Sequence, residues 1–487
     1  MKKFFINIAL LISTISFSQS VVIDNSFGTN GMIELPFDCS GNPTTKSILL
    51  SNGKIIFLGT RINGSNNNEV FISRLNSNGT IDSDFGNNGF IYPNLQHYHN
   101  SYIKIQTDNK ILIYGSSNPV KLIRLEEDGM YDSSFGVNGV FELPANSYHS
   151  EDSAFFNGNN LLILNDGKIL LRYLQGLNGT ATLLKLNQNG TPDLNFGINS
   201  LLVGLSSKAI FLGNDNKIIG FNFTSNDYTI EKFNLDGSND TTFGTNGSML
   251  VNLPYTDFET KYIEQDNFGR FLVERLTFNT TPAFEFEIFR LNNNGLIDTS
   301  FGNNGFVNFN NFQTLILPTV LVNNKYYFGG TTIVSNTFDN LIILKYDENG
   351  TLDTGFNGIG YLIENTNSLQ EGCESINIQT DGKILVSGKY KNGDTYKLFI
   401  MRYIDQNLST NYFEKSSLKI INPVRDTLNI NTEDEINNIS IIGTDGKLIM
   451  KTSEKNIDTS KLSKGMYIIV VEFKSDEKKH ISKIVKQ

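Results

Sequence analysis

Three histidines occupy matching positions in two successive segments of the chain, and histidine is a common metal ligand. His97 and His99 are two residues apart, so on an extended strand their side chains project to the same side. His149 follows at the corresponding point of the next segment. Together with a nearby carboxylate they could bind Zn²⁺. The alternative is three solvent-exposed loop histidines, since nothing in the spacing fixes the distances between them.

The two cysteines of the chain, Cys39 and Cys373, are candidates for one disulfide. They lie near opposite ends of a long repetitive region, so a bridge requires a fold that brings these ends together. An oxidising extracellular setting would favour the bridge. The alternative of two free thiols is also open.

Motifs of familiar enzyme classes are missing from the sequence. It has no Gly-x-Ser-x-Gly elbow, no phosphate-binding loop and no His-Glu-x-x-His motif. Residues 76–82 and 347–353 partly resemble Ca²⁺ loops, but the closing acidic ligand is missing and Asn-Gly turns explain them more simply. We therefore predict no catalytic residue and no cofactor, with Ca²⁺ or Zn²⁺ binding as the open alternative.

An internal repeat supplies the elements that must position these side chains. The pattern Asp-x-x-Phe-Gly occurs six times, and a seventh copy at residues 353–357 has Asn in place of Gly. Two further patterns recur once in each repeat: a basic residue followed by a hydrophobic one, and a turn followed by a basic residue. Self-similarity at this spacing indicates a repeat architecture. The seven phenylalanines are Phe27, Phe85, Phe135, Phe196, Phe243, Phe301 and Phe356.

Each unit contains four short strand patterns. In the second unit they fall at residues 89–92, 102–106, 110–114 and 121–125. The fold class we predict for residues 21–405 is therefore all-β, a seven-bladed β-propeller of four-stranded blades. We expect each repeat phenylalanine to wedge between neighbouring blades. Because each unit already holds four strands in order, we expect the ring to close without an exchanged strand.

Charge limits the partners of the protein. The formal net charge is −10, and the first 20 residues and residues 417–487 each carry +2, which leaves −14 on the body. Phosphate binding requires clustered Lys and Arg, so we expect no nucleic-acid partner.

Residues 1–20 have the features of a secretory signal peptide. Two lysines precede an apolar stretch from Phe4 to Phe17, and small residues allow cleavage after Ser18 or Ser20. That stretch is too short to span a bilayer, and no later segment approaches the required length. We therefore expect an exported protein with no transmembrane segment.

The repeat resembles the delta-60 type, a β-propeller family of unassigned function, over roughly residues 21–405. The Asp-x-x-Phe-Gly copies and the Gly-Lys-Ile and Arg-Leu strands carry this likeness. The resemblance implies a fold but no agreed activity. Asn357 is the one departure from the pattern, and it puts only that inter-blade turn in question.

Residues 418–487, which follow a polar linker at 406–417, contain short alternating strands that predict a small C-terminal β-sandwich. This segment resembles the type A sorting domain of type IX (Por) secretion. The resemblance implies the type IX machinery as partner, export through periplasm and outer membrane, and usually removal of the domain. A simple adhesive sandwich is the alternative. The matching residues are Asn422, Pro423, Gly446, Gly465 and Tyr467.

These patterns favour a secreted or cell-surface protein with a non-catalytic binding or adhesion role. Its ligand would be an extracellular glycan or protein, because variable loops on a rigid scaffold commonly carry binding. The alternative is an extracellular hydrolase or lyase that acts on polysaccharide at the mouth of the propeller channel. Carboxylates and Arg in that channel would favour the enzyme, whereas small apolar or Asn side chains would favour binding.

Overall fold

Antiparallel hairpins are the unit from which the structure is built. At one of them Asn109 takes a left-handed φ of 65°, and the Asp108 carboxylate accepts a hydrogen bond from the backbone N–H of Lys110 (3.3 Å). This turn sends the chain back along itself, so β8 (Ile111–Gly115) pairs with β7 (Tyr102–Ile105). All five residues of β8 are buried, as expected for a strand covered on both faces.

The chain divides into two compact units, residues 1–407 and 408–487. In the described part the only helix is the 3-10 turn η1 (Phe356–Gly358), and no helix there is long and apolar enough to cross a membrane. The computed structural model describes residues 20–486 except 40–44, 64–67, 96–100, 116–118, 149–158, 177–178, 224–226, 252, 254–257, 278–284, 310–313, 335–336, 365–371, 407–418, 421–423, 433–434, 444–446 and 475–478.

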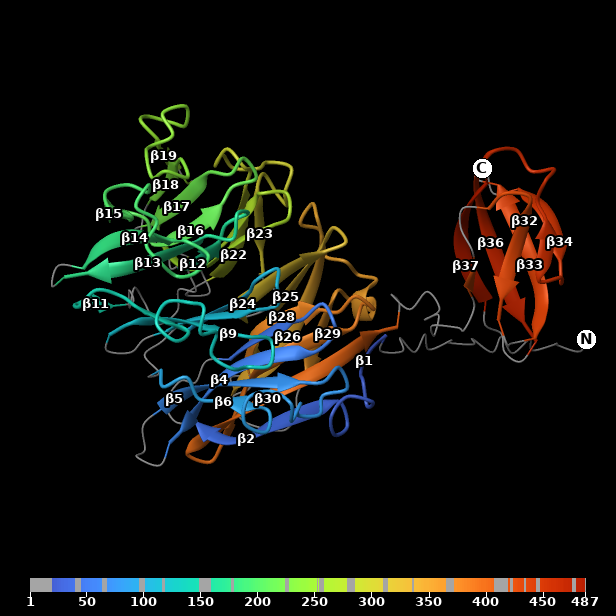
Figure 1. Ribbon diagram of the computed structural model, residues 1–487, viewed down its shortest axis with the longest axis horizontal. Helices are drawn as coiled ribbons and strands as arrows, with labels where there is room; N and C mark the ends of the chain where they lie inside the picture. The colour runs from blue at the N-terminus through green and yellow to red at the C-terminus, as the bar shows by residue number, and fades with distance from the viewer. Residues whose placement is uncertain are drawn as a thin grey trace, which may run out of the picture. The chain divides into compact units, whose positions relative to one another are not determined.

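Seven antiparallel sheets make up the described part of the first unit, and they succeed one another along the chain (Figure 1). We number these sheets as blades 1–7, and they confirm the predicted all-β propeller of four-stranded blades. Blades 1–4 contain β3 (Lys46–Leu49), β4 (Ile55–Ile62), β5 (Asn68–Leu75) and β6 (Phe90–Ile91); β7, β8, β9 (Lys121–Leu125) and β10 (Val140–Glu142); β12 (Leu161–Ile163), β13 (Ile169–Gln175), β14 (Thr180–Leu186) and β15 (Leu201–Leu205), with β11 (Ser147–Tyr148) also on β13; and β16 (Ala209–Leu212), β17 (Ile218–Phe223), β18 (Tyr228–Phe233) and β19 (Ser248–Val251). Blades 5–7 contain β20 (Phe258–Gln265), β21 (Phe271–Thr277), β22 (Glu285–Leu291) and β23 (Phe306–Asn308); β24 (Thr314–Val322), β25 (Lys325–Val334), β26 (Thr337–Asp347) and β27 (Tyr361–Glu364); and β28 (Gly372–Ile378), β29 (Ile384–Asn392) and β30 (Thr395–Asp405).

The N-terminal segment closes the ring, so our expectation of closure without an exchanged strand is wrong. β1 (Val21–Ile23) and β2 (Met32–Cys39) both pair with β30 and together complete blade 7. In Figure 1 the blue β2 accordingly lies beside the orange β30. In a circular array of blades the chain can begin and end at any strand. Here the ends lie within blade 7, so the N-terminal strands pair with the edge of β30, which would otherwise be exposed.

Cys39 and Cys373 are both buried free thiols, and the disulfide that we considered is not formed. Cys39 ends β2 and Cys373 lies on β28, with β29 and β30 between these two strands of blade 7. Three strand spacings separate them by roughly 14 Å, whereas a disulfide requires Cα atoms within about 7 Å. Strand pairing, rather than a covalent bridge, joins the ends of the propeller.

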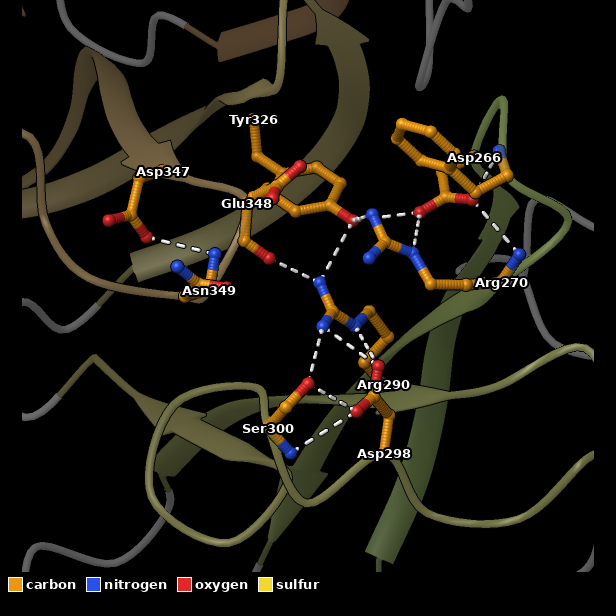
Figure 2. Close-up of polar contacts among 10 residues, drawn as sticks. Asp266, Arg270, Arg290, Asp298, Ser300, Tyr326, Asp347, Glu348 and Asn349 are labelled. Atoms are coloured by element: carbon orange, nitrogen blue, oxygen red, sulfur yellow. Dashed lines mark hydrogen bonds and ion pairs between the residues drawn. The ribbon is translucent and has the colours of Figure 1, made fainter.

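In six of the seven blades a buried basic residue ties the repeat motif together. In blade 5 the Nε of Arg290 donates a hydrogen bond to Asp298 Oδ2 (2.8 Å), and the guanidinium lies 4.6 Å from the ring centroid of Phe301. Arg290 and Phe301 are each 1% exposed. Burial acts to raise the pKa of Asp298, but hydrogen bonds from Ser300 and the charge of Arg290 outweigh it and lower the pKa. We call this Asp–base–Phe arrangement the latch; Figure 2 shows its Arg290 and Asp298 together with Ser300.

The latch also holds the next blade. Figure 2 shows Arg290 Nη1 donating to the backbone carbonyl of Glu348 in blade 6. The Gly302 N–H donates to the neighbouring carbonyl of Asn349 (2.6 Å). Glycine is required there, because its φ is 56° and a Cβ would lie 2.1 Å from the carbonyl oxygen of Phe306.

The cation–ring contact of the latch recurs in all seven blades, and in six of them the base also forms an ion pair with the motif aspartate. In blade 4 Lys232 pairs with Asp215 instead (2.6 Å). In all seven, the cationic group lies 4.5–5.6 Å from the ring centroid of the repeat phenylalanine. Six of these phenylalanines are at most 1% exposed, and Phe243 is half-buried. The pairs are Arg402–Phe27, Arg74–Phe85, Arg124–Phe135, Lys185–Phe196, Lys232–Phe243, Arg290–Phe301 and Lys345–Phe356.

Asn357 keeps the seventh turn despite replacing glycine. Its φ is 51°, close to the 52–56° of the six motif glycines. Its Oδ1 accepts a hydrogen bond from the Val21 N–H (3.3 Å), and its Nδ2 donates to the Tyr361 carbonyl (3.1 Å). Asparagine tolerates the left-handed region, so the departure from the repeat leaves this junction intact.

The second unit contains two antiparallel sheets. Its core includes Leu428, Ile439, Ile441 and Ile469, each fully buried. Tyr467 is 9% exposed, and its hydroxyl donates to the Ser463 carbonyl (2.7 Å). The smaller sheet contains β31 (Lys419–Ile420), β32 (Thr427–Asn431) and β35 (Asn456–Asp458), and the larger contains β34 (Leu448–Thr452), β33 (Ile436–Gly443), β36 (Gly465–Phe473) and β37 (Lys479–Lys486).

Ring closure through β2 predicts that Leu35→Ala is strongly destabilising. Leu35 is fully buried in a core cluster shared by blades 7 and 1, so its truncation should lower the free energy of unfolding by about 2–5 kcal/mol. The exposed neighbour Pro36 provides the control, and Pro36→Ala should change the same quantity far less. Urea unfolding of both variants measures the difference, and equal losses would contradict closure through a buried β2.

The latches predict a loss of stability in acid. All seven motif aspartates have lowered pKa values, because hydrogen bonds and nearby cations outweigh the burial that opposes ionisation of most of them. Their unfolded pKa is about 3.9, so their stabilising contribution is present above about pH 4 and is lost as the pH falls toward the lower folded values. The free energy of unfolding should therefore drop steeply from about pH 4 to pH 2 in urea titrations.

Asp298→Asn is the matched variant for this pH series. It should be less stable than the wild type at pH 7, because it leaves Arg290 without its carboxylate. It should then lose less stability on acidification, because one depressed pKa has been removed. An acid loss as large as that of the wild type would refute the assignment.

Candidate functional site

The innermost strands of the blades line a polar channel. A cavity of about 450 Å³ is bounded by residues of β3, β7, β20, β24 and β28, together with Asn159 before β12. A cavity of this volume can hold a small ligand. Its polar lining includes Lys46, Lys104, Tyr262, Glu264, Glu374 and Asn377.

Two lysines from adjacent blades share one side of this channel. Lys46 begins β3 in blade 1, and its Nζ lies 4.6 Å from the ring centroid of Tyr102 on β7 in blade 2. Lys104 lies on the same strand as Tyr102. Burial lowers the pKa of Lys46 to about 8, and the charge of Lys104 acts in the same direction against the charges of Glu374 and Glu264. The lysines are therefore close enough to repel each other.

Glu264 lies on β20 in blade 5, and the charges of Lys46 and Lys104 act on its carboxyl group. Burial raises its pKa, although the Tyr262 hydroxyl donates a hydrogen bond to its Oε2 (2.7 Å) and both lysines favour its ionised form. Glu274 on β21 lies near Glu264 and is 2% exposed. Burial raises the pKa of Glu274 to about 8, against a hydrogen bond donated by Thr319 (2.8 Å), and the Glu264 charge raises it further. Both carboxyls are thus held toward the protonated state.

Glu374 and its polar neighbours join blade 7 to blade 1 at the channel. Lys389 forms an ion pair with Glu374, and the Thr45 N–H donates to its other oxygen (2.7 Å). Nearby, Asn377 Nδ2 donates to Ser47 Oγ (2.9 Å), and the hydroxyls of Ser47 and Ser375 are 3.1 Å apart. Glu374 is therefore already neutralised, whereas Glu264 has no lysine within ion-pair distance in the described part of the chain.

Three histidines are the Zn²⁺ ligands that the sequence suggested. His97, His99 and His149 all lie outside the described residues. Within the described residues, no group of three His, Cys, Asp or Glu side chains could hold a metal ion. Of the sorting-domain residues, Asn422, Pro423 and Gly446 are also outside the described part.

Sequence reasoning missed Lys46 and Lys104. The signal that could have revealed them is a lysine within the short first strand of each of two successive repeats, where most positions are apolar. The relation of Glu264 to these lysines depends on a ring that brings β20 opposite β3. Repeat alignment alone cannot supply that relation.

The fold and channel define a repeat β-propeller, and the second unit is a small β-sandwich. Residues 50–85, 106–135 and 323–356 match the family described as a beta-propeller domain of unknown function (DUF5122). Residues 422–487 match the secretion system C-terminal sorting domain. These matches confirm both resemblances, to the propeller family in three stretches of the repeat region and to the type IX sorting domain at residues 422–487, and type IX secretion exports the protein to the cell surface or the extracellular medium.

Solved structures with similar folds are distant in sequence. A protein of unknown function from Bacteroides caccae is 14% identical, covering 60% of this chain and 90% of that one, with a TM-score of 0.36. One from Dyadobacter fermentans is also 14% identical, covering 79% and 99%, with a TM-score of 0.37. The beta-propeller domain of the Trilobed protease from Pyrococcus furiosus is 11% identical, covering 75% and 95%, with a TM-score of 0.41. Similarities at this level say nothing about function, and no curated protein matches the chain.

The lysine pair predicts a measurable change in the titration of Lys46. In Lys104→Met the repulsion that lowers the Lys46 pKa is removed, so that pKa should rise from about 8 toward the ordinary lysine value. NMR of ¹³C-dimethylated lysines reports this pKa directly. Lys391→Met, at an exposed position outside the channel lining, is the control and should leave it unchanged. An unaltered Lys46 pKa in Lys104→Met would show that the two ammonium groups do not interact.

Proposed function

We propose that this exported propeller is a non-catalytic binding protein whose ligand occupies the central channel. The observation that carries the proposal is the combination of charged and hydrogen-bonding side chains in one cavity of about 450 Å³. Binding sites are commonly such cavities with a few convergent polar groups. The inner strands that present these groups belong to blades tied together by the latches, so little conformational entropy is lost when a ligand binds.

The state of the channel carboxylates supports binding over catalysis. Glycoside hydrolases generally use two carboxyl groups, and both must be free to contact the bond that is cleaved. Glu374 is instead engaged by Lys389 and by the Thr45 N–H. Ser47, Ser375 and Asn377 add hydrogen-bonding groups, and no arginine contributes to the described lining.

One observation favours the second candidate, a hydrolase or lyase that acts on polysaccharide. Glu264 and Glu274 both have raised pKa values, and a carboxylic acid that stays protonated near neutral pH can serve as a general acid. Glu274 does not line the cavity, however, so it would have to act through Glu264. Release of reducing sugar by the wild type, abolished in Glu264→Gln, would establish this alternative.

Blocking the channel tests the binding proposal. Asn159 lines the cavity, and in the described contacts only its backbone carbonyl takes part, by accepting a hydrogen bond from Ile210 (3.0 Å). Asn159→Trp should therefore fill the channel without unfolding the propeller. On an array of neutral, amino and acidic oligosaccharides, it should weaken any binding seen with the wild type by about tenfold or more.

The control is Asn293→Trp, which places the same indole on an exposed turn. It should bind as the wild type does. Wild-type binding that survives Asn159→Trp would place the ligand outside the channel and overturn the proposal.

A further inference from the structure

The charges of the channel are arranged asymmetrically. Lys46 and Lys104 stand on blades 1 and 2, and Glu264 stands on blade 5. Glu374 adds little free negative charge, because Lys389 neutralises it. The described lining of the channel therefore presents two ammonium groups against the carboxyl of Glu264, which favours an anionic ligand.

The opposite wall provides hydrogen-bond acceptors rather than a second anion site. Glu264 accepts from Tyr262 through Oε2, so its remaining oxygen can face the cavity that it lines. Ser47 and Asn377 line the same cavity on the side of Lys46, at the junction of blades 7 and 1. A ligand that satisfies both walls needs an anionic group for the lysines and a neutral donor for Glu264.

A hydroxyl suits Glu264 better than an ammonium group does. The two lysines repel a third cation. Burial also penalises the ionised carboxylate that an ammonium group requires, whereas a hydroxyl can hydrogen-bond to either protonation state. The geometry points to a carboxylate that carries hydroxyl groups, that is, an acidic sugar. We propose that Lys46 and Lys104 bind the carboxylate of a uronic-acid unit in the channel while Glu264 accepts from its hydroxyls. This inference rests on the channel being the binding site.

Calorimetric titration of the full exported chain with trigalacturonate tests the proposal, with its methyl ester as the probe that removes only the charge. The acid should bind about tenfold or more tightly than the ester. Lys104→Met should abolish most of that preference and leave ester binding unchanged. Lys391→Met should behave as the wild type. Gluconate, a free hydroxy acid, distinguishes a small metabolite from a polymer unit as the source of the carboxylate: tighter binding of gluconate than of trigalacturonate would overturn the sugar assignment.

Proton uptake gives a second readout at the lysines. The groups that act on Lys46 are Lys104, Glu264, Glu374 and the Tyr102 ring. A carboxylate bound there raises the pKa of Lys46 from about 8, so binding at pH 8 should take up protons, seen as a dependence of the binding heat on buffer ionisation enthalpy. Lys46→Met should remove this uptake.

The possible outcomes distinguish failure of the acidic-sugar inference from failure of the proposal that the channel binds a ligand. Equal binding of acid and ester that Asn159→Trp abolishes would refute the acidic ligand and leave the channel as the binding site. Binding of the acid that survives both Asn159→Trp and Lys104→Met would refute both. No binding of trigalacturonate by the wild type would overturn the acidic-sugar assignment alone.

Discussion

The propeller depends on a buried cation held between an aspartate and a phenylalanine ring. Each latch places a charged group where water is largely excluded, and an isolated charge there would cost several kcal/mol. Arg290 avoids that cost, because its nitrogens bond to Asp298, to Ser300 and to the carbonyl of Glu348 in the next blade. The ring of Phe301 covers its face. The charge is thus satisfied only when two blades lie in the correct relation.

This requirement makes the latch a device for register as much as for stability. Apolar packing between blades tolerates sliding, since it has no direction. A guanidinium that must bond to one carboxylate and one backbone carbonyl does not, because those hydrogen bonds are directional. Four blades repeat this guanidinium device, with Arg74, Arg124, Arg290 and Arg402, and so fix their sheets against the next and help to fix the inner strands around the channel.

The channel shows the opposite use of charge. In the channel Lys46 and Lys104 lie near each other, and burial together with that repulsion lowers the pKa of Lys46. The latch cations are stabilised by hydrogen bonds and ion pairs, whereas repulsion between Lys46 and Lys104 adds nothing to the stability of the fold. Perturbed groups gathered in a cavity are typical of functional sites, which is why the channel rather than the rim carries our proposals.

The sequence alone determined the repeat, the four strands per unit and the sorting domain. These features are encoded locally, because turn residues such as Asn109 and the period-two alternation act within a few residues of one another. Tertiary structure alone decided the exchanged strand, the separation of Cys39 from Cys373 and the charge pattern of the channel. Lys46 and Glu264 lie more than two hundred residues apart in the chain, and their relation is set by the number and order of blades between them. Local patterns specify each blade, but only closure of the ring specifies which side chains share its centre.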